Sequence, residues 1–186
     1  MEKEIKKAIK ILKKGGIMIY PTDTIWGIGC DATNQKAVKK LCKIKQRYYK
    51  NFIILLDDKN KIGLYVNEPS EIAIDFITTI DNPLTIIYPG AKNLPKNVIG
   101  SDGSIAIRIV KNDFCKKLIT SFGKPIVSSS PNLSGKDTPL TFNNISSEII
   151  KQVDYVYPFD QNEIIKIKES TIIKFKNGYE FDVIRN

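Results

Sequence analysis

An uncharged loop rich in hydroxyl groups is the most informative chemical feature of this sequence. The apolar run 125–127 leads into three consecutive serines, and Asn132, Ser134 and Gly135 follow. Hydroxyls, a side-chain amide and exposed backbone N–H groups can hold phosphate or carboxylate oxygens without a fixed counter-charge. The same composition is also typical of a polar surface turn. Residues 128–135 are called the serine loop below.

A second polar cluster follows a predicted strand at residues 17–20. Thr22 and Thr24 flank Asp23 in a turn, and Trp26 follows beside two glycines. Threonine hydroxyls at a strand end can hold a small polar ligand, and glycines let the backbone approach it closely. An ordinary transition from strand to turn explains the pattern equally well.

Two segments carry cations next to apolar runs. Arg108 interrupts the apolar stretch 105–109, where an arginine is unfavourable unless it is paired, faces a ligand or lies on the solvent side of an edge strand. Lys45 and Arg47 lie between a predicted helix and a predicted buried strand. If the chain is extended there, both side chains point the same way and suit a di- or triphosphate. The simpler alternative is a solvated basic face.

The remaining polar segments are weaker signals when each is taken alone. The serine loop continues through residues 136–139, and Ser170 precedes a predicted hairpin that ends at Arg185. The sequence contains no Walker A motif, no G-x-G-x-x-G and no kinase-type motif. The residues therefore predict a site for an anionic ligand without naming a reaction.

The composition excludes several kinds of chemistry. The 186-residue chain has no histidine, which removes Ser-His and Cys-His nucleophilic catalysis and most zinc sites. Its three cysteines are far apart, so neither a disulfide framework nor a zinc ribbon is predicted. No apolar run reaches membrane-spanning length and the N-terminus is typical of a charged helix, so we expect a cytoplasmic protein without a membrane partner. A formal net charge of +9 favours anionic partners, either nucleic acid or phosphorylated small molecules.

Hydrophobic periodicity predicts the elements that must position these residues. Helices are expected at 3–14, 36–44, 70–77, 113–121 and 143–151, and strands at 17–20, 52–56, 84–88, 105–110, 126–127 and 155–157. A hairpin is expected at 172–184, and Asn34 is expected to cap the second helix. Helices and strands interleave, but the C-terminal end is antiparallel. We therefore predict a single α/β domain over residues 1–186, with a mixed parallel and antiparallel sheet flanked by helices.

In this order along the chain, the motifs resemble the YrdC-type threonylcarbamoyl-AMP synthase family. The matching segments are a P-T-[DE]-T-x-[YW]-G turn at 21–27, K-x-R at 45–47, the arginine-bearing strand at 104–109, the S-x-S-x-N-x-S-G loop at 128–135, and S-T-I-I at 170–173 with a final arginine. The resemblance extends from Gly16 to Arg185. It implies the short, single-domain form of the family, a twisted mixed sheet with helices around a concave basic cleft.

The resemblance also implies a reaction. Family members condense L-threonine, bicarbonate and ATP, with Mg²⁺ and without an organic cofactor, into threonylcarbamoyl-AMP and pyrophosphate. A downstream tRNA threonylcarbamoyl-transferase complex passes the group to the adenosine beside the anticodon. This chemistry fits a chain without histidine, because the protein mainly positions three substrates and stabilises negative charge.

The resemblance assigns a role to each motif residue. The predicted catalytic residues are Lys45 and Arg47. The predicted threonine-binding residues are Thr24, Arg108 and Ser128. The predicted ATP-binding residues are Arg47, Asn51, Ser104, Ser130, Thr138, Ser170 and Arg185, and the serine loop is completed by Asn132 and Ser134. No residue is assigned as a metal ligand.

Three positions depart from the family pattern. Tyr48 stands where proline usually follows K-x-R, Pro131 replaces an alanine in the serine loop, and Leu56 replaces a histidine that many members carry near the threonine site. The first two departures are expected to affect local turns, and the third leaves the threonine contact incomplete or supplied by another group.

Two alternative functions stay open. Residues 36–50 contain seven basic and no acidic residues, which suits a non-catalytic relative that binds double-stranded RNA or tRNA weakly. A weaker alternative is carbamoyl transfer, as in a related domain of hydrogenase maturation proteins. An RNA binder needs charge alone and tolerates lysine for arginine, whereas the enzyme needs Arg47 and Arg108 themselves.

Overall fold

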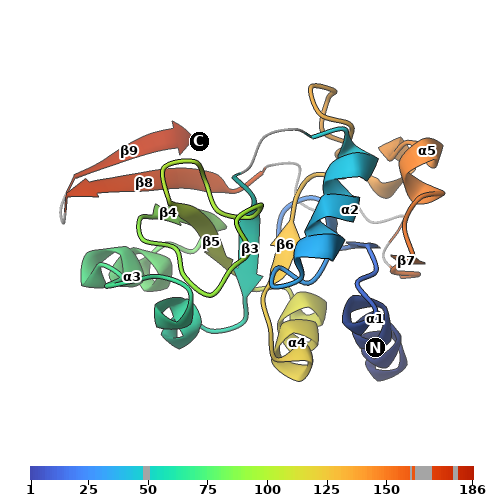
Figure 1. Ribbon diagram of the computed structural model, residues 1–186, viewed down its shortest axis with the longest axis horizontal. Helices are drawn as coiled ribbons and strands as arrows, with labels where there is room; N and C mark the ends of the chain where they lie inside the picture. The colour runs from blue at the N-terminus through green and yellow to red at the C-terminus, as the bar shows by residue number, and fades with distance from the viewer. Residues whose placement is uncertain (48–50, 160, 162–168, 178–179) are drawn as a thin grey trace.

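Helices and strands alternate along most of the chain, as the hydrophobic periodicity predicts (Figure 1). The structure is a computed structural model that describes residues 1–47, 51–159, 161, 169–177 and 180–186. The helices are α1 (Glu2–Lys13), α2 (Gln35–Lys45), α3 (Glu71–Thr79), α4 (Asp113–Phe122) and α5 (Ser147–Ile150), and the 3-10 helices are η1 (Lys59–Leu64) and η2 (Phe142–Asn144). The strands are β1 (Met18–Tyr20), β2 (Gly27–Gly29), β3 (Ile53–Leu56), β4 (Leu84–Tyr88), β5 (Ile105–Ile109), β6 (Ile126–Ser128), β7 (Tyr155–Val156), β8 (Thr171–Asn177) and β9 (Glu180–Arg185).

The described strands form two sheets, and each contains parallel and antiparallel pairs. The six-stranded sheet has the order β6-β3-β5-β4-β8-β9, in which β3 is parallel to β5 and β4 is parallel to β8. The three-stranded sheet has the order β2-β1-β7, with β1 antiparallel to β2 and parallel to β7. These pairings confirm the mixed α/β class, although the strands divide into two sheets where the sequence predicted one.

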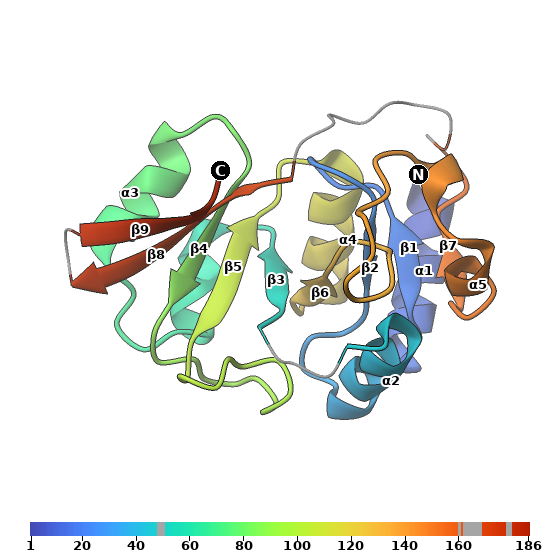
Figure 2. The same cartoon turned by 90° about the horizontal axis from the view of Figure 1, so that it is seen from above.

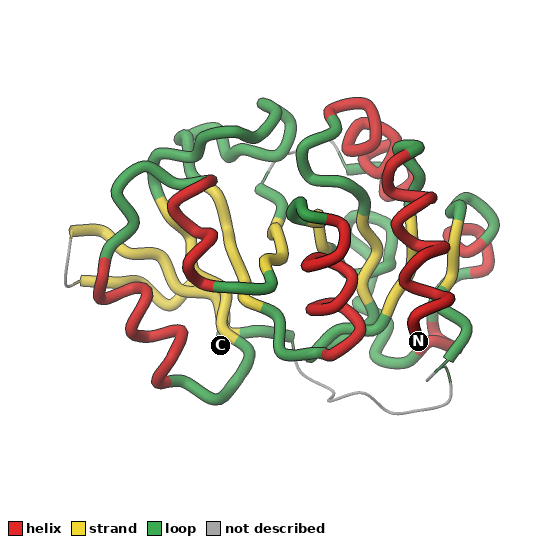
Figure 3. The backbone as a smooth tube through the Cα atoms, turned by 90° about the horizontal axis from the view of Figure 1, so that it is seen from below, coloured by secondary structure: helices red, strands yellow, loops and turns green. Residues whose placement is uncertain are grey.

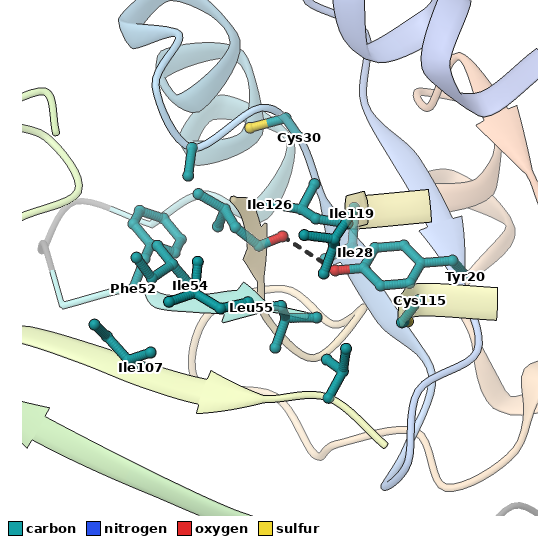
Figure 4. Close-up of a cluster of buried hydrophobic side chains, with 14 of the residues drawn as sticks. Tyr20, Ile28, Cys30, Phe52, Ile54, Leu55, Ile107, Cys115, Ile119 and Ile126 are labelled. Atoms are coloured by element: carbon teal, nitrogen blue, oxygen red, sulfur yellow. Dashed lines mark hydrogen bonds between the residues drawn. The ribbon is translucent and has the colours of Figure 1, made fainter. Parts of the chain in front are cut away.

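The two sheets meet where β2 approaches β6. An isolated bridge pairs Ile28 with Ser129. A Cβ atom on Gly29 would lie 1.8 Å from the carbonyl oxygen of Val127, so only glycine permits this approach. The hydroxyl of Tyr20 donates a hydrogen bond to the same carbonyl at 3.1 Å within a cluster of buried side chains (Figure 4). These contacts hold the start of the serine loop against the three-stranded sheet.

Helices cover one face of the sheets. Helices α3 and α4 lie against the six-stranded sheet and α1 lies against the smaller one (Figures 1 and 3). Because side chains alternate along a strand, Ile105 and Ile107 of β5 share one face, while Ala106 and Arg108 share the other. The view in Figure 2 shows that helices leave the other face of the central strands uncovered. Polar side chains of β5 can therefore serve a site there.

Most expected elements are found, with differences at three places. The cap at Asn34 is confirmed, because its side-chain oxygen accepts hydrogen bonds from the backbone N–H groups of Lys36 and Ala37. The helix expected at 143–151 is wrong in extent, since only α5 and the short η2 form there. Neither β2 nor η1 was expected. The Gly-Ile-Gly sequence of β2 has low strand propensity, and its pairing with β1 makes it a strand.

Candidate active site

A cavity of about 330 Å³ lies over the helix-free face of the six-stranded sheet, within the size range of small-molecule sites. Strands β3, β4, β5 and β8 each contribute side chains to it. The turn after β1, the serine loop, the segment after α2 and the two ends of the C-terminal hairpin complete the lining. The lining residues are Thr22, Thr24, Ile25, Trp26, Arg47, Asn51, Ile53, Ile87, Ala106, Arg108, Ser128, Ser129, Ser130, Glu169, Ser170, Ile172, Ile184 and Arg185.

Two parts of this lining differ in burial. We call the buried polar residues from the strands and the first turn the inner wall, and the partly exposed polar residues from loops and the chain end the outer wall. The inner wall consists of Thr22, Thr24, Arg108 and Ser128. The outer wall consists of Arg47, Asn51, Ser129, Ser130, Glu169 and Arg185.

Arg108 is the buried cation of the inner wall. Strand β5 lies between β3 and β4, and the residue is 4% exposed, so the alternative of a solvent-facing arginine on an edge strand is wrong. Its Nη1 donates to Oγ1 of Thr24 at 3.0 Å, and its Nε lies 3.9 Å from Oδ2 of Asp23. Among the described residues its Nε has no hydrogen-bond partner. Arg108 therefore presents a fixed positive charge beside the cavity, and its Nε–H group is available as a further hydrogen-bond donor.

The two threonines of the first turn orient this arginine. The hydroxyl of Thr22 donates to the carbonyl of Ile25 at 2.7 Å, so it accepts in its 3.0 Å contact with the hydroxyl of Thr24. The hydrogen of Thr24 is thus directed to Thr22, and its lone pairs face Arg108. The structure brings Thr24 and Arg108 together, as predicted, and Ser128 lines the same cavity.

Asp23 supplies the negative charge behind Arg108. Both of its carboxylate oxygens are buried and lack a hydrogen-bond partner within the described part of the chain. A carboxylate in such surroundings is unfavourable unless a cation lies near it. Burial, and secondarily the charge of Asp23, raise the pKa of the Cys115 thiol, which donates to the carbonyl of Pro21 at 3.1 Å. This thiol stays protonated and has a structural contact.

Arg47 is the cation of the outer wall that faces the serine loop. Its Nη1 donates to Oγ of Ser129 at 3.2 Å, and its Nη2 donates to the carbonyl of Asn51 at 2.8 Å. The guanidinium carbon also lies 4.3 Å from the ring centroid of Phe52, a cation–π contact. The predicted residues Arg47, Asn51 and Ser130 thus line one part of the cavity. Hydroxyls and a planar cation at one place suit phosphate oxygens.

Lys45 also contacts the serine loop, but it does not line the cavity. The expected extended segment is wrong, because Lys45 is the last residue of α2 and Gln46 adopts a left-handed conformation with φ 51°. The Lys45 ammonium donates to the backbone carbonyls of Ser130 and of Asn132, the second at 2.7 Å. Its own carbonyl accepts from the N–H of Ser134 at 2.8 Å. Lys45 is 3% exposed, and burial, followed by repulsion from Arg47, lowers its pKa to about 7.

The C-terminal hairpin contributes an ion pair to the outer wall. Arg185 pairs with Glu169, and its Nε and Nη2 donate to the carbonyl of Ser170 at 3.0 and 2.9 Å. The Ser170 hydroxyl is buried and lies 2.8 Å from Oγ1 of Thr85. Burial lowers the pKa of Arg185, although the charge of Glu169 opposes this shift. The predicted residues Ser170 and Arg185 therefore meet at the cavity.

Other predicted site residues lie outside the lining of this cavity. Ser104 donates to Oδ1 of Asp102 at 2.6 Å, and Thr138 lies 3.5 Å from Oε1 of Glu169. Asn132 accepts from the hydroxyl of Ser130 at 2.5 Å, so it shapes the loop. Ser134 is tied to α2 through the Lys45 carbonyl, as described above.

Sequence reasoning assigned no role to three polar residues that line the cavity, Thr22, Ser129 and Glu169, and none to its apolar lining residues. Ser129 belongs to the serine loop, and its place in the run of three serines could have identified it. Glu169 directly precedes the S-T-I-I motif. Sequence reasoning did not assign it to the site, because a carboxylate repels a polyanionic ligand.

The three family departures fall in different surroundings. Leu56 is 1% exposed and does not line the cavity, so its side chain packs in the hydrophobic core. Pro131 is buried, and the carbonyls on either side of it accept from Lys45. Tyr48 lies outside the described residues.

Among the described residues, no group of three or more His, Cys, Asp or Glu side chains could hold a metal ion. Within the same part of the chain, no helix has the length and apolar character needed to cross a membrane.

Comparisons with known proteins identify the family of this chain. The Sua5/YciO/YrdC family model, described as "Telomere recombination", matches residues 10–186. The threonylcarbamoyl-AMP synthase of Pseudoalteromonas translucida is 37% identical over 155 residues, which cover 81% of this chain and 83% of that protein.

Two solved structures share the fold. P. abyssi Sua5 complexed with L-threonine superposes with a TM-score of 0.89 at 24% identity, and E. coli YciO with a TM-score of 0.85 at 25% identity. Both alignments cover 100% of this chain, with 54% of the Sua5 chain and 89% of the YciO chain. The chain thus spans about half the length of the Sua5 protein. The match confirms the resemblance read from the motifs, and the chain belongs to the Sua5/YciO/YrdC family.

Proposed function

We propose that this protein is an L-threonylcarbamoyladenylate synthase, a nucleotidyltransferase that condenses L-threonine, bicarbonate and ATP into threonylcarbamoyl-AMP and pyrophosphate. One observation carries the proposal. A buried Arg108 held by Thr24 lies in the same cavity as Arg47 and the serine loop. A small carboxylate ligand and a polyphosphate therefore both have a cationic partner there. The name of the Pseudoalteromonas relative and the threonine complex of Sua5 support the substrates.

The inner wall suits the amino acid. Arg108 pairs with the threonine carboxylate, since a guanidinium and a carboxylate form a strong charge-assisted pair when water is excluded. Ser128 is the neighbouring hydroxyl that contacts the rest of the amino acid. Fixing the carboxylate at Arg108 orients the amino group for reaction.

The chemistry needs little covalent participation from the protein. The neutral amine of threonine attacks the carbon of bicarbonate, and loss of water leaves a carbamate. A carbamate oxygen then attacks the α-phosphorus, the bond to the β-phosphate bridging oxygen breaks, and pyrophosphate leaves. Arg47 and the hydroxyls of Ser129 and Ser130 stabilise the negative charge of the phosphates. This division of labour is consistent with a chain that has no histidine.

Mg²⁺ would enter as part of the MgATP substrate. Glu169 is the single carboxylate among the described cavity residues, and it is paired with Arg185. Mg²⁺ commonly keeps several waters and binds through substrate phosphates, so the triphosphate can carry the ion into this site. The product contains a reactive mixed anhydride. We therefore propose that a downstream tRNA threonylcarbamoyl-transferase complex consumes it, as the family resemblance implies.

The test is pyrophosphate release from the purified protein with ATP, Mg²⁺, bicarbonate and L-threonine. We expect release that depends on both threonine and bicarbonate, together with formation of threonylcarbamoyl-AMP. Matched reactions omit one substrate at a time, and one replaces threonine by its methyl ester, which lacks the carboxylate that pairs with Arg108. Release that is independent of threonine or of bicarbonate excludes the synthase. RNA binding without pyrophosphate release would favour the non-catalytic alternative.

A further inference from the structure

Glu169 is the single carboxylate among the described cavity residues, whose other charged groups are the guanidiniums of Arg47, Arg108 and Arg185. It lies directly before β8, its side chain is 32% exposed, and it lines the cavity together with Arg185 and Ser170. The proposed reaction assigns it no task. A negative group close to a bound triphosphate is unfavourable unless it serves another part of the ligand.

The contacts of Glu169 fix its place and leave it able to accept further hydrogen bonds. One carboxylate oxygen pairs with Nη1 of Arg185, and the other lies 3.5 Å from Oγ1 of Thr138, a long contact. The remaining nitrogens of Arg185 donate to Ser170, so this guanidinium is occupied by its neighbours. Arg185 therefore acts as a positioning residue that holds Glu169 at the cavity and neutralises its charge.

The chemistry of ATP identifies which of its groups suits such a carboxylate. An ionised carboxylate only accepts hydrogen bonds, and ionised phosphate oxygens also only accept. The donors of ATP are the ribose hydroxyls and the adenine amino group. Hydrogen bonds from a hydroxyl to a carboxylate are short and strong, and acidic side chains bind ribose hydroxyls in other nucleotide folds.

The neighbours of Glu169 favour the ribose over the amino group. Ile172 and Ile184 line the cavity from the same hairpin, and Ile172 is paired in register with Arg185. These apolar side chains suit the faces of the base, whereas Arg47 and the serine loop suit the phosphates. The carboxylate belongs to neither of these surfaces, and the sugar is the part of the nucleotide that joins base and phosphates.

We propose that Glu169 accepts a hydrogen bond from a ribose hydroxyl of the bound nucleotide and thereby selects ribonucleotides over their deoxy analogues. This inference rests on the proposed function for the identity of the nucleotide. It makes Glu169 a specificity-determining residue, and Arg185 acts through it.

The experiment measures the dissociation constants of ATP, 2′-deoxy-ATP and 3′-deoxy-ATP by calorimetry, without threonine, and pyrophosphate release with all substrates. The unmodified protein is expected to bind ATP about 10-fold to 100-fold more tightly than at least one deoxy analogue, the range for a hydrogen bond to a charged group. Glu169→Gln and Glu169→Asp should weaken ATP binding and reduce this ratio to about 3-fold or less. The matched control is Glu180→Gln, at an exposed position of β9 that does not line the cavity, and it should keep the full ratio.

Several outcomes would overturn the inference. Unchanged discrimination in both Glu169 variants would show that another group reads the sugar. Tighter ATP binding by Glu169→Gln would mean that the carboxylate only neutralises the charge of Arg185 and does not bind the ribose. Inosine triphosphate provides a further arm: if Glu169→Gln loses the preference for ATP over inosine triphosphate and keeps the preference over deoxy analogues, the carboxylate reads the amino group. Failure of pyrophosphate release with retained ATP discrimination would count against the proposed function alone.

Discussion

The inner and outer walls of the cavity carry similar charges in different surroundings. Arg108 of the inner wall is 4% exposed, and strands on both sides hold the strand that carries it. The side chain of Arg185 in the outer wall is 34% exposed, and the segments that carry Arg47 and Glu169 are loops. The comparison indicates that the inner wall is rigid before any ligand binds, whereas the outer wall can exchange its internal partners for those of a ligand.

Burial gives this difference an energetic meaning. A charge in a low-dielectric interior interacts strongly with its neighbours, and salt screens it little, whereas partly exposed pairs contribute little net stability. The inner wall should therefore determine both stability and recognition of the amino acid. The outer wall should affect nucleotide binding and leave stability nearly unchanged.

The largest expected effect comes from Arg108→Met. Loss of the guanidinium removes the partner of the threonine carboxylate and should lower kcat/KM for threonine by about 10²-fold to 10³-fold. It also leaves the carboxylate of Asp23 buried without a cation, which should lower the free energy of unfolding by about 3–5 kcal/mol. Steady-state kinetics and urea unfolding measure the two effects.

A second variant separates these two consequences. Asp23→Asn combined with Arg108→Met removes both charges, so stability should recover in large part while activity stays low. If the single variant is as stable as the unmodified protein, Arg108 does not stabilise the buried carboxylate of Asp23. If activity returns with stability in the double variant, Arg108 serves the fold and not the substrate.

The next effect concerns the outer wall. Arg47→Ala removes the cation that faces the serine loop and should lower the rate of pyrophosphate release by about 10²-fold. Because Arg47 is only half-buried, the free energy of unfolding should change by about 1 kcal/mol or less. Arg47→Lys is the matched control, since it keeps the charge and loses the planar fork. Full activity of Arg47→Ala would exclude Arg47 from the proposed chemistry.

The inner wall could be predicted from the sequence more fully than the outer wall. Arg108 lies within β5, where strand periodicity fixes the face on which its side chain lies, and Thr24 lies in the turn that directly follows β1. The ion pair between Glu169 and Arg185 forms only after folding brings the two side chains together. The local sequence does not specify which partner each of these side chains takes.

Lys45 shows the limit most clearly. The K-x-R spacing suggested two cations on one side of an extended chain, but the left-handed residue Gln46 ends α2, and Arg47 lines the cavity while Lys45 holds the backbone of the serine loop. A helix end is not set by residue spacing alone. Likewise, β2 forms through its pairing with β1, and Gly29 permits the close approach of β2 to Val127, contacts that strand propensity does not describe.

The smallest expected effect on activity is that of Lys45→Met. The ammonium of Lys45 holds the carbonyls of Ser130 and Asn132, so its loss should loosen the serine loop and raise KM for ATP by about tenfold, as expected for displaced positioning groups. Lys43→Met is the matched control, because Lys43 is exposed on the same helix and should behave as the unmodified protein. Equal KM values for the two variants would contradict a role for Lys45 in holding the loop.

The same lysine predicts how stability depends on pH. Its pKa is lowered to about 7 in the folded protein, whereas an unfolded lysine has a pKa of about 10.4. Between these values the unfolded chain binds more protons, so the contribution of Lys45 to stability rises with pH from about 7 to about 10.4 and is lost as pH falls through the folded pKa. Urea unfolding at pH 6, 7.5 and 9 should therefore give a difference between the unmodified protein and Lys45→Met that grows in favour of the unmodified protein at higher pH. A difference that stays constant over this range would mean that Lys45 is protonated throughout. The contribution of Lys45 to stability would then resemble that of the partly exposed cations of the outer wall, although Lys45 is buried.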